Sequence, residues 1–229
     1  MTIVPLEGIK ACVFDAYGTL FDLSSAVSGC PGLPGEKRGA LGALWRDKQL
    51  QYTWLRAAQG RHADFHQVTG DALDFALETL GIAGPDLRAH LMDLYLTLAV
   101  FPEVPGVLRR LKAAGMRLAI LSNGTPAMLA AAVGGAGLDG LFDAVISAED
   151  VGVFKPHPAV YQHALDRLDL AAPQLAFQSS NAWDAHAASA FGMRVVWCNR
   201  YGQRPERLPG RPDREVTSLA DLAPLVGAA

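Results

Sequence analysis

Several polar and charged residues follow short apolar runs, and their types could support nucleophilic chemistry. Asp15 ends the apolar part of "VFDAYGT", and Lys155 lies in "VFKPHP". The pattern S-x-N-x-x-D is formed by Ser179, Asn181 and Asp184. An aspartate can attack an electrophilic centre when a neighbouring cation favours its ionised form. These residues are therefore candidates for one polar site, provided that the fold brings them together.

The runs that carry these residues have the character of strands in a parallel sheet. They are short and apolar without alternation, as expected for strands buried on both faces: "IKACVFDAYGT", "RLAILSNGT", "FDAVISAED", "QLAFQSSNA" and "RVVWCNR". Helical patterns lie between the later runs, at 106–114, 126–136, 158–168 and 182–191. Thr125 and Pro126 mark the start of the second of these helices, as N-cap and first-turn residue. The alternation predicts a doubly wound α/β domain.

A second region, residues 22–100, contains no strand candidate. Its apolar residues recur at helical spacing in "KRGALGALWRDKQLQYTWLRAAQG", "DALDFALETLG" and "PDLRAHLMDLYLTLAVF". The stretch 30–39, "CPGLPGEKRG", is predicted to be a loop by its proline and glycine content. We expect a core domain made of residues 1–21 and 101–229, with residues 22–100 inserted as a helical cap.

The position of a site follows from this organisation. Ligands of open α/β sheets bind beyond the carboxyl ends of the strands. The polar residues at that edge include Asp15, Ser122 and Asn123, and the stretch 179–181. Because the insertion leaves the end of the first strand, the site should lie between the core and the cap.

Composition excludes several classes of function. The chain has 229 residues, is 50% hydrophobic and carries a net charge of −3, so no basic field favours nucleic acid. It shows no basic segment leading into a long apolar run, so we expect neither secretion nor membrane insertion. The three cysteines, Cys12, Cys30 and Cys198, form no metal or disulfide pattern and fit reduced thiols in a cytoplasmic protein.

Taken in order, five stretches resemble the haloacid dehalogenase (HAD) superfamily, and its L-2-haloacid dehalogenase branch most closely. They are "FDAYGTLFD", "LWRDKQLQYTWLR", "ILSNGTP", "VFKPHPAVY" and "SSNAWDAHAASAFG", and the resemblance covers essentially the whole chain. It implies a Rossmann-like α/β core, an inserted helical cap and an aspartate nucleophile. It also implies a homodimer that takes 2-haloacids as substrate and releases halide, without a cofactor or a metal.

Tyr17 distinguishes the dehalogenase branch from the phosphatases of the same superfamily. Phosphatases carry a second aspartate two positions after the nucleophile, to protonate a poor leaving group, and they bind Mg²⁺ through further acids. Here that position is Tyr17, and the last motif offers Ser179, Ser180 and Asn181 where phosphatases have carboxylates. Halide leaves as a stable anion and needs no proton. A phosphatase-like hydrolase and a non-catalytic binder of small carboxylates are the alternatives.

The resemblance also implies roles for individual residues. Asp15 would attack C2 of a short (S)-2-haloalkanoate, and water would then hydrolyse the aspartyl ester to the (R)-2-hydroxyacid. Arg46 would receive the halide, Thr19 would orient the nucleophile, and Lys155 would keep Asp15 ionised. The positions that match catalytic residues are Asp15, Thr19, Arg46, Lys155, Tyr161, Ser179, Asn181 and Asp184. The positions that match substrate contacts are Ala16, Tyr17, Arg46, Leu50, Phe65, Ser122, Asn123 and Trp183.

Plainer roles compete with these at several positions. An isolated helix arginine or surface lysine is usually solvated, Asn181 could simply cap a helix, and Leu50, Phe65 and Trp183 could be ordinary packing residues. Three positions depart from the family pattern. Gln178 replaces an apolar residue expected in the last core strand, so it needs a buried partner. Asp47, next to Arg46, could weaken halide binding if it faces inward. His186 is hypothesised to activate the hydrolytic water, against a plain role as a partly exposed helix residue.

Overall fold

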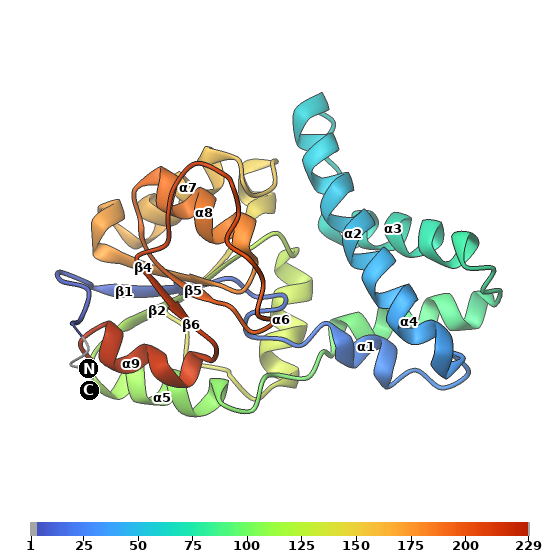
Figure 1. Ribbon diagram of the computed structural model, residues 1–229, viewed down its shortest axis with the longest axis horizontal. Coiled ribbons are helices and arrows are strands. Elements are labelled where there is room, and N and C mark those ends of the chain that lie inside the picture. The colour runs from blue at the N-terminus through green and yellow to red at the C-terminus, as the bar shows by residue number, and fades with distance from the viewer. Residues whose placement is uncertain (1–3, 229) are drawn as a thin grey trace.

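A single parallel sheet forms the centre of the core domain. The computed structural model describes residues 4–228, and its sheet has the strand order β3-β2-β1-β4-β5-β6 (Figure 1). The strands are β1 (Ala11–Phe14), β2 (Arg117–Ser122), β3 (Ala144–Ser147), β4 (Leu175–Ser179), β5 (Arg194–Cys198) and β6 (Arg214–Val216). The sequence predicted five of them; β6 was missed because it is only three residues long and mostly polar.

The register of the sheet places the residue after β1 level with the ends of its neighbours. Phe14 pairs with Ile120 of β2 and with Gln178 of β4. The next residue, Asp15, donates its backbone N–H to Gln178 O at 2.8 Å. Every residue of β1 is buried, as the uninterrupted apolar run predicts for a strand covered on both faces. Asp15 therefore emerges from the most protected strand at the carboxyl edge of the sheet.

Helices cover both faces of the sheet, with α7 and α8 on one side and α5 and α9 on the other (Figure 1). The core helices are α5 (Val104–Ala113), α6 (Pro126–Gly135), α7 (Pro158–Leu168), α8 (Ala182–Phe191) and α9 (Leu222–Leu225), with short 3₁₀ helices η1 (Ala148–Val151), η2 (Ala172–Gln174) and η3 (Leu219–Asp221). Thr125 caps α6 as predicted, since its Oγ1 accepts from Met128 N at 3.2 Å. The predicted α/β class is confirmed.

The helical region between β1 and α5 stands beside the sheet (Figure 1). Its helices are α1 (Ser24–Ser28), α2 (Gly35–Gln59), α3 (Phe65–Thr79) and α4 (Pro85–Leu96). The prediction of a loop over 30–39 was wrong in its second half, because α2 already begins at Gly35. Pro34 serves as its N-cap residue and Glu36 places a negative charge at the positive end of the helix dipole, so the same composition starts a helix. Among residues 4–228, none of the helices combines the length and the apolar character that crossing a bilayer requires.

Candidate active site

The two carboxylate oxygens of Asp15 have unequal surroundings. Oδ2 accepts from Thr19 Oγ1 at 3.0 Å, from Asn181 Nδ2 at 2.8 Å and from Ser179 Oγ at 3.4 Å. Among residues 4–228, Oδ1 accepts from Lys155 Nζ alone, at 3.1 Å. The residue is only 6% exposed. Thus Oδ2 is saturated with donors, whereas Oδ1 keeps a lone pair free for chemistry.

The Lys155 ammonium lies between two buried carboxylates. It is 1% exposed and donates to Asp15 and, at 2.9 Å, to Asp184 Oδ2. Tyr161 OH donates to the other oxygen of Asp184 at 2.6 Å. Burial alone would lower the pKa of Lys155, but the two carboxylates outweigh it and the net direction is upward, so the group stays charged. Burial raises the pKa of Asp184, against the opposing effect of Lys155.

This arrangement does not suit a divalent cation. Mg²⁺ requires several oxygen ligands around one point, preferably anionic. Here the Lys155 ammonium already lies between the carboxylates of Asp15 and Asp184. In the part of the chain that the structure describes, no three His, Cys, Asp or Glu side chains come together in a way that could hold a metal ion. The donors around Asp15 thus differ from those that a metal-dependent phosphatase needs.

Donors for an anionic ligand lie close to the nucleophile. The backbone N–H groups of Ala16 and Tyr17 donate to no protein acceptor within residues 4–228. Ser122 is fully buried at the end of β2 and Asn123 is 7% exposed. The Asn123 side chain also holds the loop of the active-site lysine, since its Oδ1 accepts from Lys155 N at 2.9 Å.

Arg46 reaches the site from the cap helix α2. One guanidinium nitrogen donates to Asn181 Oδ1 at 3.1 Å, and another donates to Gln49 Oε1 at 2.7 Å. Among the described residues, no carboxylate lies within ion-pair distance of Arg46. Asp47 is exposed and forms no ion pair there. The cation of the cap is therefore held by neutral oxygens only.

Aromatic side chains close the site on the cap side. The Tyr17 ring lies 5.7 Å from that of Phe65 and 5.3 Å from that of Tyr95. Burial raises the pKa of Tyr17 well above its usual range, so its hydroxyl stays neutral. A cavity of about 660 Å³ is lined by Arg46 and Asn181 among others, and both Leu50 and Trp183 contribute to its wall.

The chain is similar to known proteins over most of its length. The family model of the haloacid dehalogenase-like hydrolases matches residues 9–192. The chain belongs to this family. It is 46% identical to the (S)-2-haloacid dehalogenase of Pseudomonas sp. strain YL, over 96% of this chain and 95% of the relative. It is 44% identical to (S)-2-haloacid dehalogenase 1 of Pseudomonas sp. strain CBS-3, over 96% and 98% of the two chains.

A solved structure of L-2-haloacid dehalogenase from Xanthobacter autotrophicus, with chloropropionic acid covalently bound, has the same fold. Its TM-score is 0.90 at 38% identity, and the match covers 96% of this chain and 98% of that one. The predicted resemblance to the L-2-haloacid dehalogenase branch is confirmed.

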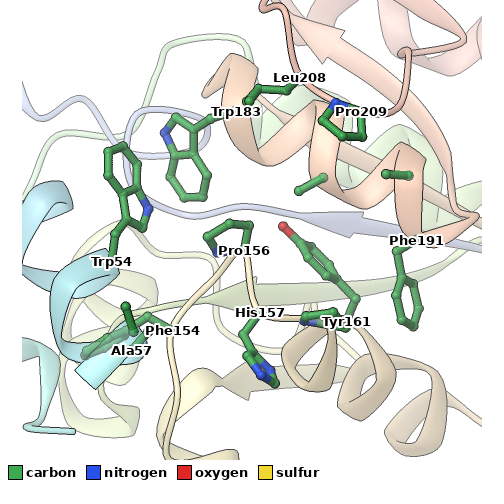
Figure 2. Close-up of a pocket in the computed structure, with 14 residues that line it drawn as sticks. Trp54, Ala57, Phe154, Pro156, His157, Tyr161, Trp183, Phe191, Leu208 and Pro209 are labelled. Atoms are coloured by element: carbon green, nitrogen blue, oxygen red, sulfur yellow. The ribbon is translucent and has the colours of Figure 1, made fainter. Parts of the chain in front are cut away.

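A second cavity of this haloacid dehalogenase-like hydrolase is almost entirely apolar (Figure 2). It has a volume of about 760 Å³ and lies between α2, α7 and α8. Trp54 of the cap and Trp183 of the core both line it, and their rings meet edge to face with centroids 5.5 Å apart. Trp183 therefore borders both cavities, and Tyr161 lines only the apolar one.

The geometry of the site matches the sequence predictions for some residues and not for others. Hydrogen bonds join all eight residues predicted to be catalytic into one network. His186 is 5% exposed and is not partly exposed as its alternative role assumed. Its Nδ1 has no partner among residues 4–228, and no hydrogen bond joins it to Asp15 or Asn181, so its role in water activation stays a prediction. Gln49 was missed, although its spacing of three residues from Arg46 on a helix is a usable signal.

Proposed function

We propose that this protein hydrolyses short-chain (S)-2-haloalkanoic acids to (R)-2-hydroxyalkanoic acids through an ester on Asp15, without a metal ion. The observation that carries the proposal is the Lys155 ammonium between Asp15 and Asp184. A fixed organic cation there supports chemistry at a carboxylate nucleophile. Tyr17, in place of a general acid, fits a leaving group that needs no proton.

In the first step Asp15 Oδ1 attacks C2 of the substrate from the side opposite the halogen. The new C–O bond forms as the carbon–halogen bond breaks, and the halide leaves with the bonding electrons. Attack from the back inverts the configuration at C2. Oδ1 is the suitable atom because, within the described part of the chain, it accepts only from Lys155, whereas Oδ2 already accepts from three side chains.

In the second step water attacks the carbonyl carbon of the ester. Oδ2 then carries the developing negative charge, and the donors on Thr19, Asn181 and Ser179 stabilise it as an oxyanion hole does. The bond between Cγ and Oδ1 breaks, so the hydroxyacid departs with Oδ1 and takes a proton. The oxygen of the water remains in Asp15, and the second proton is released to solvent.

The carboxylate of the substrate and the departing halide call for separate donors. The unused N–H groups of Ala16 and Tyr17, with Ser122, are assigned to the carboxylate. Arg46 and Asn123 are assigned to the departing halide, and Leu50, Phe65 and Trp183 to the apolar walls. His186 keeps its proposed part in activating water; slower ester hydrolysis in a single turnover of His186→Ala would support it, and an unchanged rate would contradict it.

Three further properties belong to the proposal. Residues 22–100 act as the cap, and residues 1–21 and 101–229 as the core. A cytoplasmic location is supported by the three cysteines, which are all free and buried. A homodimer is supported by exposed apolar side chains on α2 and α3, namely Trp54, Leu55 and Phe75. Mass measurement by light scattering at several concentrations tests the dimer.

The proposed reaction is tested by halide release from L-2-chloropropionate in the presence of EDTA. We expect release by the wild type, none from the D-enantiomer, and loss of release in Asp15→Asn. Asp93→Asn, an exposed aspartate on α4, is the matched control and should behave as wild type. Halide release at the same rate by Asp15→Asn and the wild type would contradict the mechanism. Turnover of phosphate esters with Mg²⁺, or binding of 2-haloacids without turnover, would favour one of the alternative functions.

A further inference from the structure

We propose that Gln49 is a positioning residue whose neutral side-chain oxygen holds the Arg46 guanidinium while leaving its charge available to the departing halide. The inference rests on the proposed function, because it concerns the halide side of the same site. Gln49 is 1% exposed within α2 and lies one helical turn after Arg46. It contacts no reacting atom, so any effect on the reaction passes through Arg46.

The orientation of the Gln49 amide follows from its neighbours. Thr69 Oγ1 donates its only proton to Phe65 O at 2.6 Å. It can therefore only accept from Gln49, whose Nε2 donates to it at 2.7 Å. With the nitrogen turned to Thr69, the oxygen Oε1 must face Arg46, where it accepts at 2.7 Å. The hydrogen bonds thus fix which end of the amide the guanidinium contacts.

The network also anchors Arg46 to the rest of the cap. Gln49 Nε2 donates a second hydrogen bond to Tyr95 OH of α4, at 2.9 Å. The Tyr95 ring packs 5.3 Å from Tyr17 and 5.3 Å from Trp45. Gln49 thus connects α2 to α3 and α4 at the point where all three helices face the site. A movement of the Arg46 guanidinium would break this buried network.

The groups that hold Arg46 must be neutral if the arginine is to attract an anion. Asn181 holds the other side of Arg46 in the same way, because its Nδ2 donates to Asp15 and its Oδ1 is left for the guanidinium. Arg46 is therefore fixed on two sides by amide oxygens. A carboxylate at position 49 would make a similar contact but would also cancel the charge, and in a low-dielectric site that loss is large. The amides fix the direction of the cation without reducing its attraction for halide.

Two substitutions separate the position of Arg46 from its charge. Gln49→Glu keeps the shape and the acceptor but pairs Arg46 with a carboxylate. Gln49→Met keeps the size and the free charge but removes the acceptor. Gln51→Glu is the matched control, since it adds the same charge two residues along α2, where the side chain is exposed. Circular dichroism and thermal unfolding identify any variant that is not folded.

The binding readout is the line width of the bromide-81 NMR signal in sodium bromide, with Arg46→Met as the reference for non-specific binding. We expect Gln49→Glu to weaken the Arg46-dependent bromide binding at least about tenfold. Gln49→Met should keep it within about threefold. In a burst assay with L-2-bromopropionate, both variants should slow first-turnover halide release by about tenfold or more, with Gln51→Glu unchanged.

Three results would overturn the inference. They are an absence of Arg46-dependent bromide binding in the wild type, equal bromide binding by Gln49→Glu and wild type, and an equal loss of bromide binding in Gln49→Glu and Gln49→Met. A merely structural role would lower binding in both variants in parallel with thermal stability. If the wild type binds bromide as expected yet releases no halide from any 2-haloacid, the proposed function fails while the assignment of Gln49 stands.

Discussion

The core and the cap hold their cations in opposite ways. In the core, Lys155 bonds to two carboxylates, those of Asp15 and Asp184, and is almost completely buried. In the cap, Arg46 bonds to the amide oxygens of Gln49 and Asn181 and to no carboxylate of the described residues. One cation is neutralised by its partners, and the other is not.

This difference teaches how one small site can serve two anions at different stages. A neutralised cation stabilises a carboxylate nucleophile that is present throughout the cycle. A cation without a counter-ion is ready for a charge that appears only when the carbon–halogen bond breaks. The following predictions test the cation of the core first and then the contacts between the core and the cap.

The largest effect is expected for Lys155→Met. Removing the ammonium leaves Asp15 and Asp184 buried beside each other without a cation, at a cost of about 3–5 kcal/mol in the free energy of unfolding at pH 7. First-turnover halide release should fall by about 10²- to 10³-fold. Urea unfolding and rapid-quench halide assays measure the two effects, with the exposed Lys10→Met as control. A variant as stable as wild type would show that the carboxylates do not need the ammonium.

The same lysine gives the wild type a specific response to alkali. Its two carboxylate partners raise its folded pKa above the ordinary 10.5, in spite of burial. A group with a raised folded pKa stabilises the fold fully below its unfolded pKa, and this contribution is lost as pH rises through the folded pKa. We expect wild-type stability to decline above pH 10.5 more steeply than that of Lys155→Met. Parallel stability curves for the two proteins would contradict this.

A smaller effect is expected where the core meets the aromatic wall of the cap. A Cβ added at Gly124 would lie 2.7 Å from Tyr17 Cε2, while Phe65 and Tyr95 restrict the ring from the cap side. Gly124→Ala should cost about 1–3 kcal/mol by overpacking and lower kcat/KM about tenfold. Gly135→Ala, where an added Cβ meets nothing within 4 Å, is the control. Equal kinetics for both variants would show that the ring moves freely.

The smallest effect concerns a polar contact between the two regions. Glu149 of η1 accepts from Phe65 N at 2.9 Å and bonds to His62 Nε2 at 2.8 Å, both in the cap. Glu149→Ala should cost about 1–2 kcal/mol and speed hydrogen exchange at the Phe65 amide. The exposed Glu78→Ala of α3 should do neither. Unchanged exchange at Phe65 would mean that this contact does not hold the cap to the core.

The sequence predicted the core side of the site better than the cap side, and the reason is physical. Asp15 and Ser179 lie at the ends of neighbouring parallel strands, so a local pattern and the sheet register together determine that they meet. The partner of Arg46 depends on how α2 packs against α3 and α4, which helical spacing alone does not specify. The start of α2 at Gly35 was likewise missed, because proline and glycine occur in loops and at helix starts alike.

The central claim, an ester on Asp15, is tested most directly by a single turnover in water enriched in oxygen-18, with the enzyme in excess over L-2-chloropropionate. If Oδ1 attacks C2 and water then attacks the ester carbonyl, the heavy oxygen appears in the peptide that contains Asp15. The lactate released carries ordinary oxygen. Mass spectrometry of the digested protein and of the product gives both values. Heavy oxygen in the lactate, with none in Asp15, would mean that water attacks C2 directly and would contradict the account.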